Sequence, residues 1–234
     1  MTAAASAIHN GVAFHPDVCM LSDYAAGSLC GAFALPVSVH LEYCTQCRGE
    51  VHTLDNVGAG MFEHLEPCPV SEDSLDDLFA MIDSLPQSQT RDSSVRSFPR
   101  RQGADMPRAL RELVEVDNLD SLEWKKISRS LKAATLEFGD HQREVALHHI
   151  RAGGEVVQHG HNGTEVTVVL RGSFSDQSGV YRKGDFLVRS TDDVHRPVAA
   201  QDEDCLCLSV LDAPIRLEGL LGTLARPFLR IRPR

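Results

Sequence analysis

Apolar residues recur at steps of three or four through the first third of the chain, which is the spacing of one face of an α-helix. The pattern predicts three helices, over residues 16–27, 29–43 and 47–65. A fourth helix, with a capping-box-like start at Ser74, has the clearest stripe, at Leu75, Leu78, Phe79 and Ile82. Four short helices form an all-α domain too small to bury much core, so we expect it to need an additional constraint such as a metal.

Three stretches depart from this regular pattern. Pro36 lies inside the second predicted helix, where it indicates either a kink or the true start of that helix. Residues 1–14 are small and polar, which predicts a mobile tail. Residues 217–224 return to helical spacing and predict a helix near the end of the chain.

Short β-type runs replace the helical pattern beyond residue 107. They predict strands over residues 133–138, 144–147, 165–170, 186–189, 196–199 and 205–211. The runs are closely spaced and separated by Gly and Asp turns, as in a small β-sandwich or barrel. Residues 86–107 are rich in Gln, Ser, Arg and Pro, which predicts a linker. The fold class is therefore α + β with two domains, all-α over residues 1–85 and all-β over residues 108–234.

The net charge of −10 is concentrated in the first domain. Residues 1–85 hold twelve Asp and Glu side chains but one basic side chain, Arg48, whereas residues 86–234 hold 21 acidic and 22 basic side chains. An acidic domain repels phosphates, which disfavours direct binding of nucleic acid, and it attracts a basic protein partner. The alternative is that the acidity serves only solubility.

No segment reaches the roughly 18 to 20 consecutive apolar residues of a membrane span. The N-terminus lacks the basic and apolar regions of a secretory signal. The chain has seven cysteines, an odd number, and several are spaced for metal ligation rather than for disulfides. These features predict a cytoplasmic protein that does not bind membranes.

Three potential metal ligands, His40, Cys44 and Cys47, fall within eight residues of the acidic domain. On a helix running into a turn they share one face, and a Cys-x2-Cys pair is a common zinc clip. His15, at the start of the first helix, is the best candidate for the fourth ligand of a closed tetrahedral site. A redox Cys-x-x-Cys is the alternative, but that motif belongs to a strand-to-helix setting that the pattern does not predict.

A second group of ligands occupies the predicted all-β domain. His159 and His161 leave the same face of an extended segment, and Glu165 keeps that parity. His195, on a later strand, closes the set. Three imidazoles and one carboxylate form a first-row transition-metal site, and the arrangement resembles both halves of the cupin signature. The alternative is a His-rich, solvated turn.

The two groups together resemble the ChrR family of anti-sigma factors over nearly the whole chain. In the helical domain the resemblance also rests on Tyr24-Ala-Ala-Gly27. It implies that this domain binds and occludes an ECF-type sigma factor, and that each domain holds one zinc ion. The first zinc set is His15, His40, Cys44 and Cys47, and the second is His159, His161, Glu165 and His195. The second domain is then a cupin-like jelly roll, required for the response to singlet oxygen.

The resemblance thus predicts a non-catalytic transcriptional regulator that releases its sigma factor under oxidative stress. Cys205 and Cys207 match a cysteine pair of the family, and neighbours at i and i+2 on one strand are poorly placed to form a disulfide with each other. The alternative is a metal-dependent cupin dioxygenase with an accessory helical domain, because such oxygenases also use three His and one Glu. DNA binding by the linker arginines is disfavoured because they lack aromatic partners.

Overall fold

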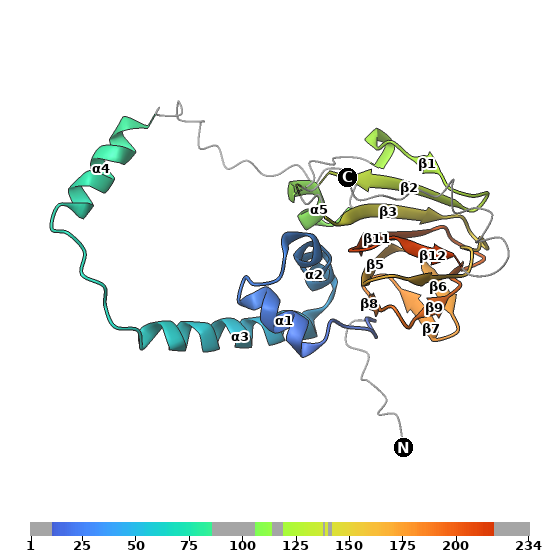
Figure 1. The fold of residues 1–234 in the computed structure, drawn as a ribbon, viewed down its shortest axis with the longest axis horizontal. Coiled ribbons are helices and arrows are strands. Elements are labelled where there is room, and N and C mark those ends of the chain that lie inside the picture. The colour runs from blue at the N-terminus through green and yellow to red at the C-terminus, as the bar shows by residue number, and fades with distance from the viewer. Residues whose placement is uncertain (1–10, 86–105, 114–118, 138, 140–141, 218–234) are drawn as a thin grey trace, which may run out of the picture.

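A computed structural model describes residues 11–85, 106–113, 119–137, 139 and 142–217 (Figure 1). Its helical part consists of α1 (Val18–Ala25), α2 (Gly31–Tyr43), α3 (Thr45–Glu63) and α4 (Ser74–Ser84). These are the four predicted helices. A short helix α5 (Arg108–Leu113) and a 3-10 turn (Leu119–Ser121) lead into the strands. No helix among the described residues is both long enough and apolar enough to cross a membrane.

Local sequence explains where the first three helices begin and end. The Asp17 carboxylate accepts a hydrogen bond from the Met20 N–H (2.8 Å) and caps α1. Cys44 is extended, so it ends α2 and begins α3, and its sulfur accepts from the Cys47 N–H. Pro36 is buried in the middle of α2, which begins at Gly31, so the alternative that Pro36 marks the start is wrong.

Helix α4 differs from the others because it packs against nothing in the described chain. None of its residues is buried, and it lies well apart from α1, α2 and α3 (Figure 1). The predicted capping box is wrong: Asp73 is the N-cap, without a side-chain hydrogen bond to the helix, and the Ser74 hydroxyl bonds that of Ser71 (2.6 Å). The predicted apolar stripe is present on α4 but is exposed to solvent.

The β part is a set of antiparallel sheets of the jelly-roll type, as predicted. One sheet has six strands in the order β1-β2-β3-β11-β5-β8, and two smaller sheets have the orders β10-β6-β7 and β12-β4-β9. The strands are β1 (Lys125–Lys126), β2 (Leu131–Leu136), β3 (Glu144–Ile150), β4 (His159–His161), β5 (Glu165–Arg171), β6 (Ser173–Asp176), β7 (Gly179–Arg182), β8 (Phe186–Arg189), β9 (Val194–His195), β10 (Val198–Ala199), β11 (Cys205–Leu211) and β12 (Ile215–Leu217).

Several strands were not predicted. The β6–β7 hairpin and β12 have no counterpart among the expected runs, and the run over residues 196–199 forms only the short strand β10. Leu217 ends β12, and the remainder of the helix predicted over residues 217–224 lies outside the described residues. Most of the predicted linker lies outside them as well, but Met106, close to its end, is buried.

The six-stranded sheet is covered on both faces, and β11 shows this most clearly because all seven of its residues are buried. Leu206, Leu208 and Val210 share a core with helix α2, which packs across β5 and β11. Cys205 and Cys207 point the other way, into a second core inside the jelly roll. Side chains alternate across a strand, so one strand serves both cores. The helical and β parts therefore share a continuous hydrophobic core.

The segment before α1 is fixed to the β part rather than free. The Ala13 and Phe14 N–H groups donate to the Asp185 carboxylate, and the Phe14 carbonyl accepts from the Phe186 N–H (3.0 Å). Val12 is 2% exposed. The expectation of a mobile tail is therefore wrong for residues 11–14, because the buried carboxylate of Asp185, 172 residues after Ala13, binds their backbone. Residues 1–10 lie outside the described part.

Candidate metal centres

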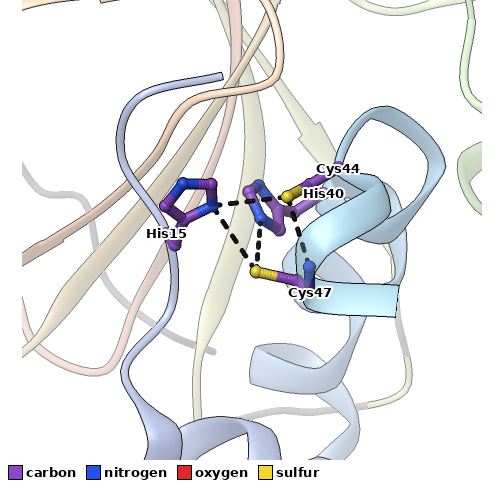
Figure 2. A group of neighbouring side chains, drawn as sticks. All are labelled: His15, His40, Cys44 and Cys47. Carbon is purple, nitrogen blue, oxygen red and sulfur yellow. Dashed lines mark hydrogen bonds between the residues drawn. The ribbon is translucent and has the colours of Figure 1, made fainter. Parts of the chain in front are cut away.

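The first group of predicted ligands comes together where α2 meets α3. Figure 2 shows His15, His40, Cys44 and Cys47 turned toward one another, and their ligand atoms all lie within 4.8 Å. His15 reaches the site from the segment before α1, whereas His40 lies in the last turn of α2. Cys44 and Cys47 are brought together by the break between the two helices.

The distances in this group suit zinc. The Nδ1 of His15 lies 3.3 Å from the Cys44 sulfur and 3.5 Å from the Cys47 sulfur, and the Nε2 of His40 lies 3.3 Å from the Cys47 sulfur. Tetrahedral zinc, with Zn–S of about 2.3 Å and Zn–N of about 2.0–2.1 Å, separates a nitrogen from a sulfur by about 3.6 Å. Two imidazoles and two thiols at these separations fit one tetrahedral ion.

The protonation state of His40 also suits the binding of a cation. His40 donates its Nδ1–H to the Gly184 carbonyl (2.7 Å), which leaves the lone pair on Nε2 facing the sulfurs. Burial lowers the pKa of His40 to about 4, so the ring is neutral at neutral pH. Burial and the neighbouring Cys44 raise the pKa of Cys47 to about 12 in the protein alone. A bound cation would reverse this shift and hold the sulfur as a thiolate.

The second group comes together inside the jelly roll. His159 and His161 lie on β4, Glu165 begins β5, and His195 on β9 pairs directly with His159. The His195 Nε2 is 2.9 Å from that of His159 and 3.3 Å from that of His161. The Glu165 Oε2 lies 3.5 Å from the His161 Nε2 and 3.8 Å from the His195 Nε2. All four side chains are buried.

The hydrogen bonds of two imidazoles leave both Nε2 atoms free to accept a cation between them. His159 donates its Nδ1–H to the Val157 carbonyl (2.8 Å), and the Nδ1 of His195 faces the Asp176 carboxylate (3.2 Å). Each Nε2 therefore carries a lone pair. Two lone pairs 2.9 Å apart repel, whereas tetrahedral zinc holds nitrogens about 3.3 Å apart. The donor set thus fits a divalent metal, with the buried Glu165 supplying negative charge.

Burial and the neighbouring ligands shift the pKa values of the side chains in this group. Burial lowers the pKa of His195 to about 4 and also lowers the pKa of His161. Burial alone would raise the pKa of Glu165, but the surrounding imidazoles, His161 foremost, lower it below its ordinary value. Neutral imidazoles and an ionised carboxylate are the protonation states that ligate a metal.

Asp176, at the end of β6, holds His195 in place. Its role was not predicted from the sequence. Its buried carboxylate also accepts hydrogen bonds from Arg189 (2.9 Å), the Tyr181 hydroxyl (3.1 Å) and the Ser178 N–H (2.8 Å). Burial would raise the pKa of Asp176, but the bonds from Ser178 and Arg189 keep it low. The sequence feature that could have indicated this hairpin is the turn-forming run Asp-Gln-Ser-Gly at residues 176–179, which connects β6 and β7.

Asp176→Asn is expected to weaken metal binding at the second group by about 10–100-fold, the usual cost of losing the partner of a ligating histidine. The measurement is the number of metal ions per chain retained during dialysis against increasing chelator. Asp202→Asn, an exposed change of the same charge, should retain metal as the unaltered protein does. Equal retention by both variants would contradict the role of Asp176.

The cysteine pair on β11 lies on the same side of the six-stranded sheet as Glu165 of the second group. The Cys205 and Cys207 sulfurs are 3.6 Å apart and buried, and both cysteines are free. His148 on β3 pairs across the sheet with Cys207. Burial lowers the pKa of His148, and the charge of Glu165 partly offsets this shift. The thiols are therefore part of the interior that surrounds the second group.

The fold and the two donor sets define a class of protein: a helical segment with a His2Cys2 site joined to a cupin-like jelly roll with a His3Glu site. The family profile described as the ChrR cupin-like domain matches residues 113–213. The chain is 36% identical over 219 residues to the anti-sigma-E factor ChrR of Cereibacter sphaeroides, which covers 93% of this chain and 98% of that protein. The chain belongs to the ChrR family of anti-sigma factors.

A solved structure agrees with this assignment. The crystal structure of Rhodobacter sphaeroides SigE in complex with the anti-sigma ChrR contains a chain that matches with a TM-score of 0.72 and 31% identity, covering 86% of this chain and 99% of that one. The predicted resemblance and fold class are thus confirmed. Membership of a family of regulators also supports the non-enzymatic interpretation over the cupin dioxygenase alternative.

Proposed function

We propose that this protein sequesters an ECF-type sigma factor and releases it under oxidative stress such as singlet oxygen. Family membership supports the first half of the proposal. The observation that carries it here is the run of large apolar side chains along the end of α3, the segment after it and α4, which nothing in the described chain covers. Residues 1–85 would perform the inhibition, residues 86–107 would be a linker, and residues 108–234 would sense the signal.

We call this region the α3–α4 surface. Its exposed apolar side chains are Val57, Met61, Phe62, Leu65, Val70, Leu75, Leu78, Phe79, Met81, Ile82 and Leu85. A monomer rarely exposes so many large apolar residues together unless they bind a partner. Residues 49–85 contain no Lys or Arg, so the surface is also acidic. An apolar helix face with acidic flanks suits a groove on a basic protein, and a sigma factor carries basic surfaces for promoter DNA.

Zinc is the metal that we assign to both donor sets. Two thiolates would neutralise the ion at the first set, and its four protein ligands make a closed structural site. At the second set, three imidazoles and a carboxylate fit zinc and also suit other first-row metals. When bound there, the metal would hold β4, β5 and β9 together through His161, Glu165 and His195.

The α3–α4 surface gives a direct test. Phe79→Asp is expected to weaken binding to the sigma factor of the same host by on the order of 100-fold, the size of effect typical of a central aromatic contact. Phe79 is 55% exposed and packs on no core, so metal content and helicity should not change. Titration calorimetry with the purified sigma factor measures the affinity.

Ser84→Asp is the matched control, since it adds the same charge on the opposite side of α4. It should bind the sigma factor nearly as tightly as the unaltered protein. If Phe79→Asp binds equally well, the sigma factor contacts another surface of the molecule, and the role assigned to α4 is wrong.

A further inference from the structure

The turn between β7 and β8 carries two contacts that reach the first metal group from the cupin-like domain. We propose that this turn positions two of the four ligands: the Gly184 carbonyl sets His40, and the Asp185 carboxylate sets the segment that bears His15. Metal retention at the first group then depends on docking of the two domains. The inference rests on the ligand roles given in the proposed function.

The first contact fixes the orientation of His40. Its Nδ1–H donates to the Gly184 carbonyl at 2.7 Å, across 144 residues of sequence. A ligating histidine binds well when its other nitrogen has a fixed acceptor, because the acceptor selects the tautomer and the ring orientation. The Phe186 ring packs edge-on against the His40 ring, 5.6 Å between centroids. Both restraints on His40 come from the cupin-like domain.

The second contact fixes the backbone next to His15. One oxygen of Asp185 accepts from the Ala13 and Phe14 N–H groups (2.7 and 3.1 Å), and the other accepts from the Arg182 N–H (2.7 Å). The Phe14 carbonyl in turn accepts from the Phe186 N–H. Phe14 immediately precedes His15. The cupin-like domain therefore binds both the N–H and the carbonyl of the residue next to the ligand.

Asp185 is placed for this role rather than for general packing. It is 1% exposed, and burying a carboxylate is costly unless hydrogen bonds replace its water. The turn itself is also in close contact with the helical part: a Cβ on Gly184 would lie 2.8 Å from Val12 and 2.9 Å from Tyr43. The Gly184 φ of +92° further favours glycine at this position.

The four ligands of the first group therefore have different supports. Cys44 and Cys47 are placed by the junction of α2 and α3. His15 and His40 are placed correctly only while the β7–β8 turn is docked. If docking strengthens metal binding, metal binding must strengthen docking by the same factor, because such coupling is reciprocal. A change in the cupin-like domain can reach the sigma-binding part by this route.

Cobalt(II) binding to the full-length protein tests the inference. Thiolate ligands give cobalt an intense near-ultraviolet charge-transfer band, and only the first group contains sulfur, so this band reports that group alone. Asp185→Asn keeps the size of the side chain and one acceptor oxygen, whereas Asp185→Ala removes all three hydrogen bonds. We expect cobalt affinity at the first group to fall by about tenfold for Asn and toward 100-fold for Ala. Asp202→Asn should not change it.

The outcomes separate the inference from its alternatives. Unchanged cobalt affinity in a folded Asp185→Asn protein, judged by near-ultraviolet circular dichroism, would overturn it. An equal loss at both metal groups would also overturn it, since that result indicates general destabilisation. If Asp185→Ala fails to fold, Asp185→Asn decides. Absence of the charge-transfer band from the unaltered protein would instead refute the metal assignment on which the inference depends.

Discussion

Cys47→Ser is expected to remove the metal from the first group and, with it, the ability to hold a sigma factor. Cys47 is fully buried among His15, His40 and Cys44, and a hydroxyl is a far poorer ligand for zinc than a thiolate. A structural zinc site contributes roughly 10–16 kcal/mol of apparent binding free energy, most of which is also folding free energy. The loss therefore exceeds the total stability of most small domains.

Metal content, far-ultraviolet circular dichroism and sigma binding measure this result on the same sample. Helicity should fall mainly in α1 and α3, because α2 also packs across β5 and β11. Cys19→Ser, at an exposed cysteine outside the group, should behave as the unaltered protein does. A protein that keeps its helicity and sigma binding after both chelation and Cys47→Ser would show that the first metal is not structural.

His161→Ala is expected to leave the sigma complex intact while abolishing its release under singlet oxygen. His161 is 2% exposed inside the second group, and no residue of that group belongs to the α3–α4 surface. Loss of an imidazole should empty or weaken that site without changing the α3–α4 surface, which we propose binds the sigma factor. Imidazoles and thiols are also the side chains most readily oxidised, and the thiols of Cys205 and Cys207 are buried in the core of the same jelly roll.

A transcriptional reporter driven by the sigma factor, with a photosensitiser in light and in darkness, measures the release. The unaltered protein should permit transcription only in light, and His161→Ala should repress it in both conditions. His149→Ala removes a histidine that pairs with Asp204 outside the metal group, and it should respond normally. Normal light-dependent release from His161→Ala would show that the sensor lies elsewhere in the molecule.

Local spacing explains why the ligands were predictable. His40, Cys44 and Cys47 fall within eight residues, and His159, His161 and Glu165 within seven, so the helix and strand periods alone place each triplet on one side. The structure brings both groups of four together. Their identity as ligands remains a prediction, and the cobalt and zinc measurements above test it.

The side chains that hold the ligands could not be predicted in the same way. Asp176 and Asp185 are two of 33 acidic residues, and their partners are chosen by contacts between strands and segments far apart in the chain. The sequence of helix α2 did indicate that the helix is buried on more than one face. Val37 and Val39 lie on opposite sides of it, and both are fully buried. Such a helix must be covered on two faces, which the expectation of a small separate domain obscured.

The shared core also fixes an order of events during synthesis. His40 precedes Gly184 by 144 residues, which corresponds to roughly 7 to 30 s of translation at about 5–20 residues per second. Helices α3 and α4 are completed within that interval, whereas β8 and β11 are made only after it. In the nascent chain the Gly184 carbonyl and the Asp185 carboxylate are therefore not yet present to set His40 and the segment that bears His15. We thus expect a newly made molecule to complete its first donor set only after the β7–β8 turn has been made and has docked.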